Sequence, residues 1–254
     1  MPPIRVGLSL RTRISTIRRR LSARFDILLM GLASLFLLVP AFYTIGMLVH
    51  PLVGQIGASA WFALIVSSAV LAVSDEDRSR WVGIGLAVPA LVSHILHNFF
   101  TGWGIVPAVV SDLLSLLFLA YTNYLLLRVL FSIRRVTANV IWGSICAYLL
   151  IGVMWAMAYS LLLRFQPDAL EGSGMRVLHE DPVGLTVVTS YFSFVTLTTL
   201  GYGDILPRTI TMRMLVVLEA VCGQVYLAVL VARLVGIYVA GGRMPRSDDT
   251  GEKS

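Results

Sequence analysis

Six long apolar segments divide this chain, and they limit its possible folds more than any other feature of the sequence. A helix needs about 20 apolar residues to cross the hydrocarbon of a bilayer. Hydrophobic residues make up 57% of the 254 residues and charged residues 13%, whereas about 25% of a soluble domain is charged. The sequence therefore predicts an all-α membrane protein with six transmembrane helices. The apolar segments run over residues 26–49, 58–73, 82–98, 104–131, 138–163 and 210–239.

The second and third segments are close to the lower limit of about 17 residues for a membrane span. Three tryptophans lie in or beside them, at Trp61, Trp81 and Trp103. Because indole rings favour the membrane–water interface, we expect these tryptophans to extend the two short spans as interfacial anchors.

Lysine and arginine are spread unequally between the two sides of the predicted membrane helices. With six spans and a cytosolic N-terminus, sixteen of the 20 basic residues lie on the inner side and four on the outer side. Cytosolic loops are enriched in lysine and arginine. We therefore expect a multi-pass protein of the plasma (inner) membrane with both termini in the cytosol and residues 164–209 facing outward.

The basic residues also bear on the partners of the chain. The net charge of +6 comes mostly from arginines next to apolar segments, which indicates membrane topology, so no nucleic-acid partner is expected. Residues 1–25 contain seven arginines. They are compatible with an amphipathic helix on anionic lipid of the inner leaflet, or with a disordered leader that only fixes orientation. The polar tail, 241–254, is too short for a folded regulatory domain.

A motif between the fifth and sixth apolar segments carries the chemistry: Thr196-Leu-Thr-Thr-Leu-Gly-Tyr-Gly-Asp204. Selecting potassium requires backbone carbonyl oxygens, stacked in rings, that replace the hydration shell of the ion. Consecutive carbonyls reach one axis only if the backbone alternates in handedness, which Gly201 and Gly203 permit. Leu200 and Tyr202 would then turn their side chains away from the axis, and Thr199 would add a hydroxyl at the inner end.

The segment before the motif favours a short helix that does not cross the membrane. Residues 184–198 are apolar but too short and too rich in threonine and serine to span. A re-entrant helix here would aim the negative end of its dipole at the pore, which favours a cation.

Thr199-Leu-Gly-Tyr-Gly-Asp204 resembles the selectivity filter of potassium channels, which usually reads Thr-Val/Ile-Gly-Tyr-Gly-Asp. The resemblance covers about residues 138–240 and is closest to the bacterial two-helix pore-domain branch of the ion channels. It implies a homotetramer, so that three identical subunits and membrane lipid are the partners of each chain. It also implies that K⁺ is the permeant ion, held by the carbonyls of Thr199 to Gly203, with no other cofactor and no enzymatic activity.

With this resemblance the chain divides into four parts. They are a basic cytosolic leader (1–25), a four-helix N-terminal transmembrane region (26–131), a potassium-channel pore domain (138–240) and a cytosolic tail (241–254). A potassium-uptake transporter subunit and a weakly selective cation channel remain alternatives. Transporter subunits of that kind carry four degraded pore loops in one chain, whereas this chain has one intact motif.

The motif departs from the family pattern at two positions. Leu200 stands where Val or Ile is usual, and Val195 stands where bacterial members often have a glutamate that supports the aspartate after the filter. The role of Asp204 is therefore open. Tyr191 could pair with Tyr202 through their hydroxyls, and a buried Glu219 could take over the support or could lie near the outer surface. The residues expected to support the filter are Thr196, Thr198, Asp204, Tyr191 and Glu219.

The last apolar segment has the features of an inner, pore-lining helix. By resemblance, Gly223 occupies the position of a hinge glycine, although a small residue there could equally serve close helix packing. Helical spacing then places a stripe on one face that would line a cavity and gate it by dewetting, or pack on a neighbour. The stripe comprises Gln224, Leu227, Val231 and Val235.

The first four segments lack the charges of a voltage sensor. Only Arg128 lies within segment 104–131, and each sensing charge contributes only about 2.3 kcal/mol per 100 mV, so steep voltage gating is not expected. Asp112 could pair with a neighbouring helix or lie at the outer end of its span. His94 and His97 share a helical face and are either a pH-sensing or metal-binding pair or ordinary interfacial residues.

Overall fold

The computed structural model describes residues 29–73, 77–99, 105–132, 137–172 and 182–242. The leader 1–25, Trp103, most of the tail 241–254 and the side chain of His97 lie outside the described residues. The helices are α2 (Leu35–Leu48), α3 (Pro51–Val73), α4 (Asp77–Phe99), α5 (Ile105–Ser132), α6 (Ala138–Phe165), α8 (Pro182–Leu197) and α9 (Ile210–Gly242). A short 3₁₀ turn, η2 (Pro167–Ala169), and two three-residue strands, β1 (Leu170–Gly172) and β2 (Ile205–Pro207), complete the described elements.

The chain is an all-α membrane protein, as the sequence predicts. Within the described residues, three helices are long and apolar enough to cross a bilayer: α5, α6 and α9. Helices α3 and α4 have 23 residues each and are longer than the apolar segments inside them. At a rise of about 1.5 Å per residue, each is about 35 Å long, which exceeds the hydrocarbon thickness of about 30 Å. Residues 51–57 continue α3 beyond its apolar run, and the polar residues 77–80 continue α4.

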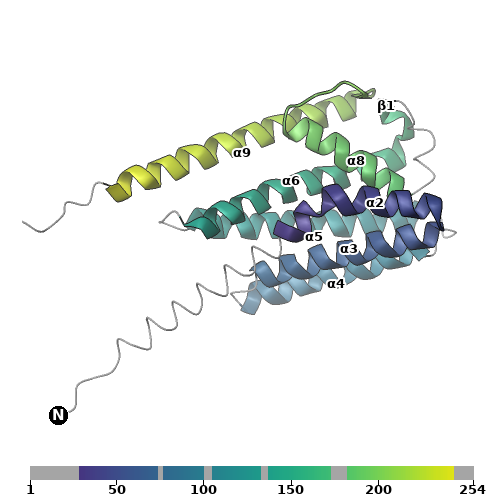
Figure 1. Cartoon of the computed structure of the whole chain (residues 1–254), viewed down its shortest axis with the longest axis horizontal. Coiled ribbons are helices and arrows are strands. Elements are labelled where there is room, and N and C mark those ends of the chain that lie inside the picture. The colour runs from purple at the N-terminus through teal and green to yellow at the C-terminus, as the bar shows by residue number, and fades with distance from the viewer. Residues whose placement is uncertain (1–28, 74–76, 100–104, 133–136, 173–181, 243–254) are drawn as a thin grey trace, which may run out of the picture.

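The helices form a bundle in which α6 is central (Figure 1). Helices α2, α3 and α4 lie on one side of α6, and α9 lies on the other. The short helix α8 lies between α6 and α9, at the end of the molecule where β1 is found. The chain after the 196–204 motif therefore returns beside α6 as the long helix α9.

Two apolar clusters hold the bundle together. The first joins Trp61 and Phe118 of the N-terminal helices to Cys146 of α6 and Phe194 of α8. The second lies between α6, α8 and α9 and contains Tyr159. The first cluster crosses the boundary expected near residue 131, so the N-terminal helices and the following helices share one core.

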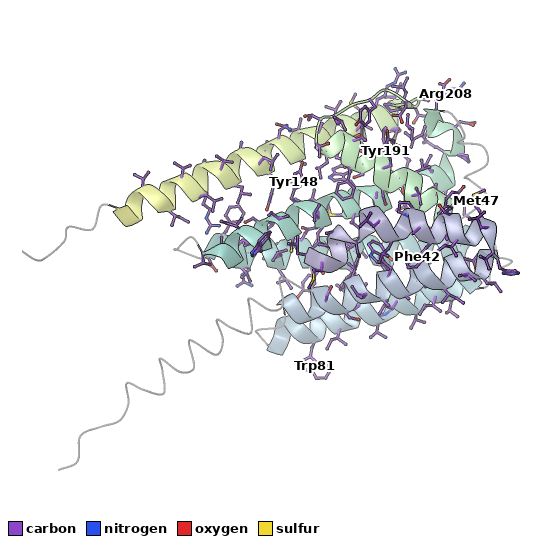
Figure 2. The ribbon with its side chains drawn as sticks, viewed as in Figure 1. Phe42, Met47, Trp81, Tyr148, Tyr191 and Arg208 are labelled. Carbon is purple, nitrogen blue, oxygen red and sulfur yellow. The ribbon has the colours of Figure 1, made fainter. Side chains whose placement is uncertain are left out.

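Trp61 corrects one expectation from the sequence. Its side chain is 7% exposed, and its indole N–H lies 3.0 Å from Ser34 Oγ and 3.2 Å from the Gly31 carbonyl oxygen. It is therefore a core residue that joins α3 to the start of the bundle, because its N–H finds polar partners inside. Trp81 is 71% exposed, which suits an interfacial anchor, and points away from the bundle (Figure 2).

A small antiparallel ladder ties the segment after the motif to the end of α6. Strand β1 pairs with β2 so that Leu170 faces Pro207 and Gly172 faces Ile205. The Arg208 amide also donates to the Ala169 carbonyl at 2.8 Å. A Cβ on Gly172 would lie 2.7 Å from the Asp204 carbonyl oxygen, so a glycine is needed for this close approach. The exit of the motif is thereby fixed against α6.

An ion pair joins α5 to α6. Arg164, in the last turn of α6, donates to both carboxylate oxygens of Asp112, at 2.5 and 3.3 Å. The two side chains are 18% and 10% exposed, so the pair is largely shielded from solvent. Asp112 therefore pairs with a neighbouring helix, which was one of the two alternatives left open by the sequence.

Replacing Asp112 by asparagine should destabilise the packing of α5 on α6. The substitution removes the charge that both Arg164 bonds require, and hydrogen bonds to charged groups contribute about 1.5–3 kcal/mol. We expect the free energy of unfolding in detergent to fall by about that amount. In a double-mutant cycle, D112N should have a much smaller effect when Arg164 is already glutamine. An undiminished effect in that background would contradict the pairing.

Candidate functional site

The backbone of the motif alternates in handedness. Thr199, Gly201 and Gly203 have φ angles of 58°, 56° and 78°, whereas Leu200 and Tyr202 between them do not have positive φ. The left-handed region is open to glycine and disfavoured for other residues by about 1–2 kcal/mol. The two glycines were predicted from the sequence, but the positive φ of Thr199 was not, because threonine rarely adopts it. A non-glycine residue in this conformation is held there by its surroundings.

Hydrogen bonds from the motif to the last turn of α8 supply that constraint. The amides of Leu200 and Gly201 donate to the Val195 carbonyl at 2.9 and 3.3 Å. The Thr199 amide donates to the Thr196 carbonyl at 2.9 Å. These bonds satisfy carbonyls that would otherwise be unpaired at a helix C-terminus. The helix and the alternating segment therefore form one hydrogen-bonded unit.

Threonine hydroxyls add to this unit. Thr198 Oγ1 donates to the Phe194 carbonyl at 2.6 Å, and Thr199 Oγ1 donates to the Thr198 carbonyl at 2.7 Å. Both side chains bond locally to backbone oxygens, whereas the half-buried Thr196 contributes its carbonyl. The three threonines thus act on the conformation of the end of α8.

Leu200 and Tyr202 direct their side chains to the same side of the segment. Both border a cavity of about 490 Å³, which Tyr191 and Val195 of α8 and Pro40 of α2 also line. Because the side chains of Leu200 and Tyr202 both face this cavity, the opposite side of the segment is left to backbone atoms. The sequence predicts this arrangement for side chains that turn away from an axis.

Asp204, directly after the motif, accepts a hydrogen bond from α8. The Tyr191 hydroxyl donates to Asp204 Oδ2 at 2.7 Å. This bond raises the pKa of the Tyr191 hydroxyl to about 12, so it stays a donor at neutral pH. Within this chain the Tyr191 hydroxyl therefore bonds to the Asp204 carboxylate, whereas the sequence had suggested Tyr202 as a possible partner. The absence of a glutamate at Val195 is thus compensated by a tyrosine one helical turn earlier; Tyr191 and Arg208 lie at the same end of the molecule (Figure 2).

Glu219 of α9 is the centre of a second polar contact behind α8. Its side chain is 0% exposed. One oxygen, Oε1, lies 2.5 Å from Ser193 Oγ of α8, and the other accepts a hydrogen bond from the Tyr159 hydroxyl of α6. Ser193 Oγ also lies 2.8 Å from the Gly152 carbonyl of α6. Glu219 therefore lies inside the protein rather than at the outer surface, and it joins three helices.

Sequence reasoning named Glu219 but neither of its partners. Tyr159 and Ser193 are one tyrosine and one serine among many in apolar segments, and no local pattern marks them. A sequence signal was nevertheless present, since a carboxylate inside a membrane helix requires polar partners on facing helices. Their identity depends on how α6, α8 and α9 pack.

Gly223 permits the close approach of α9 to the end of α8. A Cβ at this position would lie 2.6 Å from the Leu197 carbonyl oxygen and 2.9 Å from Leu197 Cδ1. The same carbonyl accepts a hydrogen bond from the Tyr148 hydroxyl of α6 at 3.1 Å. This geometry favours close helix packing, rather than a hinge, as the role of Gly223.

The stripe that follows Gly223 is uncovered in the single chain. Gln224 is exposed, as are Leu227 at 37% and Val231 at 58%. Only 11% of the apolar window of α9 is buried, compared with 50% for α6. A large apolar face of α9 is therefore available to lipid or to further protein.

His94, one histidine of the pair predicted from the sequence, contacts an aromatic side chain. The ring of His94 packs against Phe62, with centroids 4.5 Å apart. Among the described residues, no group of three or more His, Cys, Asp or Glu side chains could hold a metal ion. His97, whose side chain is outside the described residues, stays a prediction.

Comparison with known families gives a match over the region that contains this site. Residues 175–240 match the family model described as an ion channel, the two-helix pore-domain type. Over these residues the chain is similar to that family. The match includes α8, the 196–204 motif and α9, and it begins after α6. No curated protein and no solved structure matches the chain.

Substituting Gly223 by alanine should disturb the channel, and Gly236 provides a matched control in the same helix. The new Cβ at residue 223 would collide with the Leu197 carbonyl, whereas nothing lies within 4 Å of a Cβ at residue 236. We expect G223A to lower the melting temperature and ion flux, and G236A to be neutral or to stabilise by up to about 1 kcal/mol. Equal behaviour of the two variants would contradict the packing role.

The Glu219 contacts can be tested by comparing glutamine with alanine. Glutamine keeps an acceptor for Tyr159 and provides a donor for Ser193, so E219Q should remain close to the parent protein. E219A leaves a buried tyrosine hydroxyl unpaired and opens a cavity, which should reduce stability by about 1–3 kcal/mol. The readout is thermal unfolding in detergent. If E219A unfolds at the parent temperature, Glu219 does not hold the three helices together.

Proposed function

We propose that this ion channel is the pore-forming subunit of a homotetrameric, potassium-selective channel. Potassium ions pass down their gradient through residues 199–203, bound by backbone carbonyls. The observation that carries the proposal is the positive φ at Thr199, Gly201 and Gly203, with Leu200 and Tyr202 between them. This alternation turns successive carbonyls toward one side, which a ladder of ion sites requires.

Several copies are needed for this function. One chain contributes one wall of a carbonyl ring, and closed rings arise from cyclic symmetry. The exposed face of α9 supports assembly, because it gives neighbouring subunits an apolar surface to cover. Four identical subunits would place Gln224, Leu227 and Val231 around the cavity below the filter, where an apolar constriction can gate by dewetting.

The surroundings of the segment suit a rigid filter. Asp204 is held by Tyr191 on one side, and α8 is held from behind by Glu219 and Tyr148. The end of the α8 dipole points toward the carbonyl segment and favours a cation. We also propose that the chain has the four-part organisation predicted from the sequence and lies in the plasma membrane with both termini in the cytosol. Its gating would not depend steeply on voltage.

Flux from liposomes tests the function directly. The purified tetramer should pass potassium in preference to sodium, without ATP, and barium should block it. Equal potassium and sodium flux would favour a weakly selective cation channel, and flux that depends on a second substrate would favour an uptake transporter. Absence of flux from an intact tetramer would contradict a passive channel.

Gly201→Ala tests the role of the backbone. Apart from the two adjacent residues, no atom of the described residues lies within 4 Å of the new Cβ, so the strain comes from the φ of +56° itself. This strain costs about 1–2 kcal/mol in each subunit, and repetition in four subunits should lower potassium flux at least about tenfold. Crosslinking should still give a tetramer.

Leu200→Val is the matched control. Its side chain faces the cavity beside Tyr191, and its carbonyl is unchanged by the substitution. L200V should therefore keep the preference for potassium over sodium. A G201A variant with the selectivity of L200V would refute the assignment of residues 199–203 as the filter.

A further inference from the structure

A second hollow lies between α5, α6 and α9, and none of the residues that line it belongs to the 196–204 motif. It has a volume of about 300 Å³ and is open on one side. Its wall is almost wholly apolar, with a single cationic side chain. Residues that define its extent are Leu130 and Phe131 of α5, Ile151 of α6, and Cys222, Val229 and Arg233 of α9. We call it the α5–α9 groove.

The length of the groove corresponds to one leaflet of a bilayer. It runs along α9 from Cys222 to Arg233, and the eleven steps between these residues correspond to about 16 Å of helix. The hydrocarbon of a membrane is about 30 Å thick, so one leaflet is about 15 Å. A single acyl chain extended along α9 would occupy the groove from end to end.

The position of Arg233 defines the leaflet. Its guanidinium carbon lies 5.0 Å from the centre of the Phe131 ring. Phe131 is next to Ser132, the last residue of α5, so the cation lies at the end of the bundle where α5 ends and α6 begins. Positive-inside counting assigns this end to the cytosol. The groove therefore opens at the inner leaflet, with its charge at the level of the lipid headgroups.

The chemistry of the two ends is that of an anionic phospholipid. An arginine is charged at all physiological pH values and forms paired hydrogen bonds with phosphate oxygens. Its aliphatic stem and the cation–π contact with Phe131 fix the guanidinium at the mouth of the groove. The anionic lipids of the inner leaflet supply the complementary charge.

We propose that the α5–α9 groove binds one anionic phospholipid per subunit, with an acyl chain between α5 and α9 and the phosphate at Arg233. Such a lipid links the N-terminal helices to the proposed inner helix of the pore. The site is built from one chain, so it does not depend on which ion the channel conducts or on the number of subunits.

Native mass spectrometry of the full-length protein tests the proposal. The protein is stripped in detergent and titrated with phosphatidylglycerol or phosphatidylcholine that carry identical acyl chains. We expect one phosphatidylglycerol per subunit to be retained at concentrations where phosphatidylcholine is lost. R233Q should weaken phosphatidylglycerol retention about fivefold and abolish the preference between the two lipids. Equal retention of both lipids by the parent protein would overturn the proposal.

Two further variants separate the groove from general surface charge. Arg128 is an exposed arginine of α5 that does not line the groove, so R128Q should retain phosphatidylglycerol as the parent protein does. V229W fills the groove with an indole and should reduce retention of both lipids while leaving the melting temperature near that of the parent. If R128Q loses lipid as R233Q does, or V229W loses none, the lipid is bound elsewhere. Retention of neither lipid by the parent protein would also overturn the proposal.

Discussion

The carboxylate of Glu219 is the contact on which the arrangement of the pore segment depends. It is fully buried, and its two oxygens meet Ser193 of α8 and Tyr159 of α6, so one side chain fixes three helices at one level. A buried carboxylate is tolerated only with such partners, and removing any one of them leaves a polar group unpaired in a dry environment. The network therefore specifies a single packing of α8 between α6 and α9. The position of α8 in turn decides where the chain enters the 196–204 motif.

Leu197, the last residue of α8, contacts both α6 and α9. The Leu197 carbonyl accepts the Tyr148 hydroxyl, and Gly223 leaves room for that carbonyl beside α9. The following amides turn back onto Val195 and Thr196, which holds Thr199 in a conformation that threonine seldom adopts. At the other end, Tyr191 and the β1–β2 ladder hold Asp204 and the residues after it. The strained backbone is thus anchored at both ends. A segment that has exposed carbonyls and no core of its own keeps its shape only if its surroundings hold it.

Much of this could be predicted from the sequence, because its signals are local. The length of the apolar segments predicted α5, α6 and α9, and the two glycines at alternate positions predicted the alternating handedness of the motif.

The features that could not be predicted depend on contacts between segments that are far apart in the sequence. Trp61 looks like an interfacial residue in its own helix, and only the neighbouring Ser34 and Gly31 make it a core residue. For Tyr191 the sequence suggested Tyr202 as a possible partner, and the structure pairs its hydroxyl with Asp204. The two partners of Glu219 lie 60 and 26 residues away in the chain, and the partner of Asp112 lies 52 residues away, separations that no periodicity encodes.

The proposed cavity and the proposed lipid site would use different faces of α9. Residues two apart on an α-helix point about 200° from one another. Cys222 and Val229 line the α5–α9 groove, and Gln224 and Val231, each two residues further on, belong to the stripe proposed to line the cavity. The groove and the stripe are therefore on nearly opposite faces, with Glu219 and Gly223 facing α8 between them. A lipid in the groove leaves the stripe free, and a change in the tilt of α9 that moves the stripe must also move Arg233 against Phe131. In the proposed channel, lipid occupancy and the width of the cavity would therefore be linked through a single helix.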